Sequence, residues 1–172
     1  MNLTLIKIKY LLNIVRNFFS CIFWYEIINN KKISKSKCSL IVIKSKKQFY
    51  KLNINKKIII KKNKLNRFKK NIYLLLLTKN EQILSSGWVF FGKKWKVTEM
   101  NININLKKKL HLLFDFETPK KFRNKGNYTL LLKLIKNKFK KKRLAIYTLS
   151  YNFKSRRGIE SAGFKLTKKI YS

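Results

Sequence analysis

The sequence predicts one mixed α+β domain in which a largely antiparallel central sheet is flanked by helices. Between residues 72 and 117 the apolar residues alternate or form short runs, as is typical of strands. From residue 128 the apolar period changes to 3.6, and signals for a strand, a short helix and a last strand follow. A chain of 172 residues that is 45% hydrophobic can bury one core but is too short for two ordinary domains. We therefore interpret residues 1–172 as a single domain.

The first 28 residues are rich in Leu, Ile and Phe, as a membrane segment would be. The longest charge-free stretch, residues 17–25, is far shorter than the roughly 20 residues needed to span a bilayer, and no small-residue cleavage site follows it. We therefore expect no transmembrane span. Apolar residues at helical spacing predict instead a helix packed on the domain, with an interfacial membrane helix as the alternative. These residues are Leu11, Val15, Phe18, Phe19 and Ile22.

Residues 33–70 are rich in Lys and contain two short apolar runs, 40–43 and 58–60, which predict modest strands or helix ends. The pattern is clearer from residue 72. Residues 72–77 and 83–91 predict a hairpin with a turn at 79–81. Gly87 interrupts the second of these strands, and a glycine there indicates a bulge or a close backbone approach.

The segments 94–98 and 101–106 alternate between apolar and polar residues and predict two further strands. In the next strand, Leu112, Phe114 and Phe116 would share one face, and Leu113, Asp115 and Glu117 the other. We expect these strands to continue the hairpin as one antiparallel meander.

The C-terminal third predicts a helix, a strand, a second helix and a final strand. Tyr128, Leu131, Leu132, Ile135 and Phe139 lie on one face of the first helix, and the basic run 136–143 suits the negative end of its dipole. Residues 144–149 form the strand. Asn152 is a candidate N-cap of the second helix, which Gly163 ends, and residues 164–170 form the final strand.

The chain is strongly basic, with 43 Lys and Arg against six Asp and Glu and a formal net charge of +37. Such a charge raises the possibility of a nucleic-acid-binding or ribosome-associated protein. The Lys residues are instead spread along the chain among abundant Asn, Ile, Phe and Tyr, as drift in an AT-rich coding sequence would produce. We expect only non-specific contact with nucleic acid.

Cys21, Cys38 and His111 lack metal-ligand spacing, and a single cysteine pair fits a cytoplasmic protein without a disulfide framework.

Residues 122–128 join a strand to the long helix. Backbone N–H groups at such a junction have no intrahelical partner and lie at the positive end of the helix dipole, so a pyrophosphate fits there. Gly126 would permit its close approach. A strand-to-helix turn with one glycine is also common where no ligand binds.

Two motifs in the right order resemble those of the GNAT acyltransferases. Arg123-Asn124-Lys125-Gly126 is similar to their Arg/Gln-x-x-Gly-x-Gly/Ala signature, whose loop amides hold the pyrophosphate of CoA. Asn152, Ser155 and Gly163-Phe164 resemble the second signature, in which a small residue follows an Asn by three positions and Gly-Phe follows by eleven and twelve. The resemblance covers residues 72–171, whereas residues 1–71 match only as an N-terminal strand and helix region.

The sequence departs from these signatures at three positions. Tyr128 replaces the last small residue of the first signature, and Asn124 replaces one of its glycines. Ile159 stands where many members have a Tyr that acts as general acid toward the CoA thiolate. Gly87-Trp88, residues 115–118 and the loop together resemble bacterial acetyltransferases that often accompany surface-polysaccharide genes.

The resemblance implies an enzyme that moves acetyl from acetyl-CoA to an amine by direct attack, without a metal or a covalent enzyme intermediate. The acceptor would be a small amine, an amino sugar or a protein terminus. A degenerate GNAT fold without catalysis is the alternative. The residues that would contact acetyl-CoA are Phe116, Thr118, Arg123, Asn124, Lys125, Gly126, Asn127, Tyr128, Asn152 and Ser155.

A base must accept a proton from the attacking amine, and Asp115 and Glu117 are the best placed of the six carboxylates. They would share one face of a strand, opposite Phe114 and Phe116. Glu117 lies nearer the loop, and both burial and Asp115 would raise its proton affinity. The competing interpretation is a carboxylate paired with one of the many Lys residues. We expect Glu160 to pair with a Lys or Arg, and Trp88, Trp95 and His111 to belong to the core.

Overall fold

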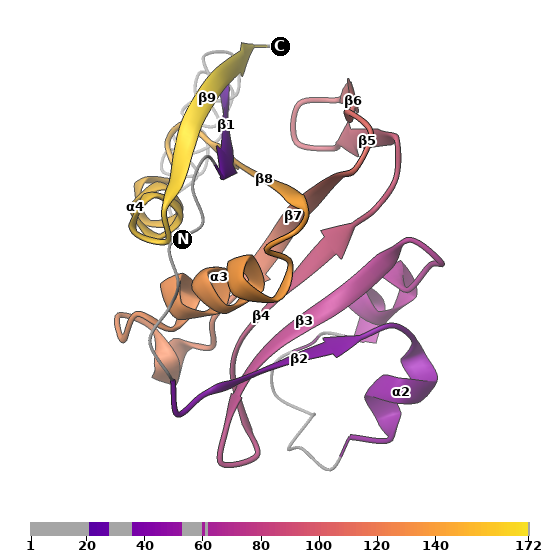
Figure 1. Cartoon of the computed structure of the whole chain (residues 1–172), viewed down its shortest axis with the longest axis vertical. Coiled ribbons are helices and arrows are strands. Elements are labelled where there is room, and N and C mark those ends of the chain that lie inside the picture. Colours follow the sequence, from indigo (N-terminus) through magenta and orange to yellow (C-terminus); the bar gives the residue numbers. More distant parts are fainter. Residues whose placement is uncertain (1–20, 28–35, 53–59, 61, 172) are drawn as a thin grey trace, which may run out of the picture.

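The computed structural model describes residues 21–27, 36–52, 60 and 62–171 (Figure 1). Seven of the described strands form one sheet in the order β2-β3-β4-β7-β8-β1-β9. Of the described pairs only β7 and β8 are parallel, and the others are antiparallel. This confirms the predicted fold class. The strands are β1 Cys21–Ile27, β2 Ser39–Ile43, β3 Ile72–Lys79, β4 Gln82–Phe90, β7 Leu110–Glu117, β8 Arg143–Leu149 and β9 Phe164–Tyr171.

Helices pack on the sheet, as predicted. Helix α3 (Asn127–Lys138) connects the parallel strands β7 and β8, and α4 (Phe153–Ser161) connects β8 to β9. Figure 1 shows α3 lying across the sheet and α4 beside β1 and β9. The remaining helical segments are α2 (Lys46–Tyr50) and two short 3₁₀ helices, Lys62–Arg67 and Lys120–Phe122. No helix in the described part of the chain is long and apolar enough to cross a membrane.

Strand β1 comes first in the described part of the chain but lies between β8 and β9 in the sheet, antiparallel to both. The sequence predicts a helix over residues 11–22. Residues 11–20 lie outside the described part of the chain. For Ile22 the prediction is wrong, because this residue belongs to strand β1. Ile22 and Trp24 enter one core, whereas Phe23 and Tyr25 enter the other. A strand buried on both faces loses the alternation that identifies a strand, so its apolar run resembles a helix.

The predicted strands after the hairpin form as β5 (Lys94–Val97) and β6 (Ile102–Asn105), but they are not part of the large sheet. They pair only with each other, and β4 pairs directly with β7, so the prediction of one continuous meander is wrong. Strand β4 already has β3 and β7 as neighbours. The apolar side of the β5–β6 hairpin therefore packs against the face of the sheet through Val97, Ile104 and Leu106.

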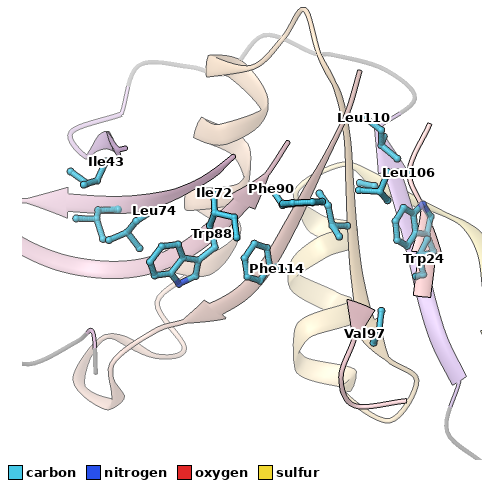
Figure 2. Close-up of a cluster of buried hydrophobic side chains, with 14 of the residues drawn as sticks. Trp24, Ile43, Ile72, Leu74, Trp88, Phe90, Val97, Leu106, Leu110 and Phe114 are labelled. Carbon is cyan, nitrogen blue, oxygen red and sulfur yellow. The ribbon is translucent and has the colours of Figure 1, made fainter. Parts of the chain in front are cut away.

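The sheet separates two cores. One contains Trp88 and Phe114 with the β5–β6 hairpin, α2 and the 3₁₀ helix Lys62–Arg67. Figure 2 shows these two side chains on neighbouring strands, with Ile43 and Leu74 at one end of the cluster and Trp24, Leu106 and Leu110 at the other. The second core lies under α3 and α4 and includes Leu131, Leu132, Ile135 and Ile159.

The β2 run 40–43 is confirmed as a strand, whereas residues 58 and 59 of the other short run lie outside the described part.

The helix ends follow the sequence signals. Asn152 caps α4 by accepting a hydrogen bond from the Ser155 N–H at 3.1 Å. Gly163 ends α4 with φ +88°, in the left-handed region that suits glycine. Lys136 of α3 is buried there, and its Nζ donates to the Ala162 carbonyl at 3.0 Å. A side chain on Gly163 would place a Cβ 2.8 Å from this Nζ.

We predict that Gly163→Ala destabilises the protein more than Gly126→Ala, the matched control. Both positions have a positive φ, so each alanine costs about 1–2 kcal/mol of backbone strain. Only the Gly163 substitution also displaces Lys136, since a Cβ on Gly126 meets nothing within 4 Å. The lost hydrogen bond should add about 1 kcal/mol. Urea unfolding followed by circular dichroism measures both; equal losses would mean that the Lys136 contact contributes nothing.

Candidate active site

A cavity of about 1300 Å³ opens where β7 and β8 separate. These parallel strands pair from Leu110 with Arg143 to Leu113 with Ile146, and no further. Beyond Leu113, the backbone groups of β7 that face β8 have no pairing with that strand. The cavity extends from the N-terminal ends of α3 and α4 to the β5–β6 hairpin.

The separation of the strands coincides with a bulge in β7. Asp115 has φ +46°, and the pairing with β4 changes register between Ser86 and Trp88. Gly87 lies opposite this bulge, and a Cβ there would come within 2.3 Å of the Phe116 ring. The predicted bulge at Gly87 is confirmed, but the group that approaches this glycine is the Phe116 ring and not backbone, as the alternative prediction had it.

The bulge also changes which side chains share a face. Phe114 enters the core with Trp88, whereas Phe116 packs on the α3 side, with its ring 5.3 Å from that of Tyr128. The predicted common face for Phe114 and Phe116 is therefore wrong. An extra residue in the strand reverses the side-chain alternation from that point on.

Asp115 and Glu117 contact the same lysine, Lys64, at 3.1 and 3.0 Å from its Nζ. Arg67 forms a further ion pair with Asp115. The two carboxylates share a face, as predicted, but not the face opposite Phe114, because the Arg67 guanidinium also lies over the Phe114 ring. The geometry therefore agrees with the competing interpretation, in which a carboxylate of this strand pairs with a Lys residue. Both cations come from the 3₁₀ helix Lys62–Arg67.

The loop before α3 has the form expected of an anion site. Asn124 and Gly126 have φ +59° and +70°. The first N–H bonded within the helix is that of Leu130, which donates to the Gly126 carbonyl at 2.9 Å. The preceding amides are therefore free of helical partners and lie at the positive end of the dipole. The side-chain Nδ2 of Asn127 donates to the Phe122 carbonyl at 2.8 Å and fixes the loop.

Arg123 also stabilises the loop, because its Nε donates to the Thr118 carbonyl at 2.9 Å. The Thr118 hydroxyl lies 2.9 Å from that of Ser85 on β4. Lys125 is exposed and does not line the cavity. Every other predicted site residue lines it, including both carboxylates.

Tyr128 connects the two signature segments. Its hydroxyl lies 3.3 Å from the Ser155 Oγ, and burial raises its pKa above the ordinary value. Its ring occupies the space over Gly158, where a Cβ would come within 2.5 Å of it. The residue that departs from the signature is thus accommodated by a glycine on the facing helix. Ile159, at the position of the usual Tyr, is fully buried in the core.

Sequence reasoning missed the residues that the β5–β6 hairpin contributes to the cavity, Trp95, Lys96, Thr98 and Glu99, and also Arg67 and Tyr147. No spacing signal could have found them, because their approach depends on how the hairpin folds back over the sheet. Trp95, predicted to be a core residue, is half-buried and lines the cavity.

Three other predictions concern residues away from the cavity. Trp88 is a core residue, and His111 is buried against Phe91, with burial lowering its pKa. Glu160 accepts a hydrogen bond from the Tyr25 hydroxyl at 3.0 Å, and among the described residues it forms no ion pair, so its pairing with a Lys or Arg stays a prediction. Within the same part of the chain, no group of three His, Cys, Asp or Glu residues could hold a metal ion.

The sequence matches no family model and no curated protein sequence. Solved structures do match. A GNAT-family acetyltransferase from Colwellia psychrerythraea has a TM-score of 0.57 and 15% identity over 94% of this chain and 59% of that one. A putative GNAT-family acetyltransferase from Novosphingobium aromaticivorans has a TM-score of 0.52 and 9% identity over 88% of this chain and 62% of that one.

The chain has the GNAT fold. A Drosophila protein is also similar, with a TM-score of 0.53 and 10% identity over 99% of this chain and 57% of that one. The chain thus spans about three fifths of the length of these proteins. None of their names mentions surface polysaccharides, so the narrower resemblance gains no support. At these identities the similarity establishes the fold.

We predict that Lys64→Met destabilises the protein by about 1 kcal/mol, since both carboxylates lose a cation in a partly exposed setting. The loss should shrink when Asp115→Asn is already present, because the two residues are coupled. Lys46→Met is the matched control, as its Nζ bonds only the exposed Asn66 amide among the contacts described. Urea unfolding of the four-member cycle measures the coupling, and additive losses would contradict it.

Proposed function

We propose that this protein transfers an acetyl group from acetyl-CoA to an amine by direct attack. The observation that carries the proposal is that one cavity joins a helix N-terminus with free amides to a pair of separated strands. The first feature suits a pyrophosphate, and the second suits the carbonyl of a thioester.

The loop Arg123–Asn127 and the start of α3 would hold the diphosphate of acetyl-CoA. Gly126 leaves open space where a side chain would otherwise lie, so a phosphate oxygen can reach the amides that follow it. Phe116, Thr118, Asn152 and Ser155 line the same end of the cavity and would contact the rest of the donor.

In the reaction the amine nitrogen attacks the thioester carbonyl, a C–N bond forms and the C–S bond breaks. The nitrogen gives up a proton, and the CoA thiolate takes one from solvent. Backbone amides of β7 beyond Leu113 have no partner on β8 and would stabilise the negative charge on the carbonyl oxygen. Neither cysteine takes part.

We propose Glu117 as the group that accepts the proton. Asp115 is held by both Lys64 and Arg67, whereas Glu117 contacts Lys64 alone. Glu117 also retains the larger exposed side-chain fraction, 35% against 28%, so one of its oxygens can reach the cavity. Its place one residue before Thr118 puts it at the entrance to the loop.

One observation favours a second candidate function, binding of CoA without catalysis. Ile159 is buried and cannot donate a proton, and the Tyr128 ring fills space between α3 and α4. In this case the loop would still bind the diphosphate, but no acetyl transfer would follow.

We predict that acetyl-CoA raises the Tm of the protein and that Gly126→Asp abolishes this shift. A carboxylate at the helix N-terminus repels the diphosphate and occupies its place. Gly126→Ala is the control: it carries the same backbone strain without the charge and should keep most of the shift. Differential scanning fluorimetry of the three proteins decides this, and an unchanged shift in Gly126→Asp would rule out the loop as the phosphate site.

We predict that Glu117→Gln lowers kcat by roughly 10²-fold or more, within the usual range for a general base, while the affinity for acetyl-CoA stays nearly constant. Glu81→Gln, in the turn between β3 and β4, is the matched control and should change neither. Thiol release measured with amine acceptors gives the rate. If Glu117→Gln keeps most of its turnover, another group accepts the proton. If the unsubstituted protein binds acetyl-CoA without turnover, the second candidate function is favoured.

A further inference from the structure

The end of the cavity under the β5–β6 hairpin has a wall made of three aromatic rings, Trp95, Phe114 and Tyr147. The Trp95 and Phe114 ring centroids are 4.4 Å apart at an interplanar angle of 50°. The Trp95 Nε1 donates to the Tyr147 hydroxyl at 3.3 Å. The three rings come from β5, β7 and β8, so a hairpin and both separated strands hold the wall in place.

Glu99, at the end of the same hairpin, also lines the cavity. Its Oε2 accepts a hydrogen bond from the Thr98 hydroxyl at 3.3 Å, and no Lys or Arg within the described ranges forms an ion pair with it. Burial raises the pKa of Tyr147 to about 12, and the negative charge of Glu99 acts in the same direction. Glu81 and Glu160 likewise form no ion pair among the described residues, but of these three carboxylates only Glu99 lines the cavity.

We propose that this end of the cavity binds the acceptor, and that the acceptor is a primary monoamine with a flat apolar body, such as an arylalkylamine. This rests on the acetyl transfer proposed above. The apolar body packs against Trp95 and Phe114, where aromatic contacts give orientation as well as affinity. The ammonium group binds Glu99 before it loses its proton.

The charges around this end exclude other amines. The nearby cations Lys64 and Arg67 are already paired with Asp115 and Glu117, so they cannot bind a carboxylate on the acceptor. Lys96 also lines the cavity, but it is exposed, and an ion pair with an exposed lysine contributes little to binding. A polyamine would be repelled by the net charge of +37.

The experiment compares phenethylamine with phenylalanine, which adds only a carboxylate, and with spermidine and glucosamine. Binding is measured by calorimetry and by Trp fluorescence without acetyl-CoA, and turnover by thiol release with it. Trp95 should report binding, because Trp24 and Trp88 are each only 1% exposed. We expect phenethylamine to bind most tightly.

Glu99→Gln should weaken phenethylamine binding about tenfold or more, the effect of losing a hydrogen bond to a charged group. The Tm shift with acetyl-CoA should not change, and Glu81→Gln should have no effect. Preference for phenylalanine, spermidine or glucosamine would overturn the proposal, as would equal behaviour of the two glutamine variants. Because amine binding is measured without acetyl-CoA, failure of the proposed acetyl transfer is distinguishable: it would abolish thiol release, and the amine-binding result would still decide this site.

Discussion

The bulge of β7 at Asp115 is the feature on which the rest of the site depends. It lies opposite Gly87, whose missing side chain leaves room for the Phe116 ring. Because the bulge reverses the alternation, Phe116 turns toward α3 while Phe114 stays in the other core. The same irregularity occurs where β7 leaves β8, and the cavity opens there. One extra residue in a strand thus separates the end of the cavity at the N-terminus of α3 from the end at the β5–β6 hairpin.

Elements with local signals could be predicted from the sequence, because their periodicity, caps and turns lie within a few residues. The β3–β4 hairpin, α3 and the Asn152 cap of α4 are of this kind. Strand β1 could not be predicted, since its place between β8 and β9 depends on partners more than 100 positions away. Its burial on both faces removed the only local signal of a strand.

The candidate site likewise has a part that local sequence signals predict and a part that depends on residues far apart in the chain. The loop Arg123–Asn127 and the two carboxylates lie close together in the sequence and could be singled out from it. Their cation partners, Lys64 and Arg67, come from about 50 residues earlier in a Lys-rich segment where no single Lys is distinguished by its neighbours. The aromatic wall joins β5, β7 and β8, and its assembly depends on the hairpin folding onto the sheet rather than extending it.

Tyr128 shows how a departure from a sequence signature can be compensated elsewhere in the fold. Its ring needs the space that Gly158 leaves on α4, and its partly buried hydroxyl has the Ser155 Oγ as a partner. A larger residue at position 158 would force the ring out, and substitution of Ser155 by alanine would remove this partner. The two helices that carry the signature segments are therefore joined at their N-terminal ends by a contact between side chains. The N-terminal residues of both helices line the same cavity, and N–H groups at a helix N-terminus that face such a space are the arrangement that a diphosphate site requires.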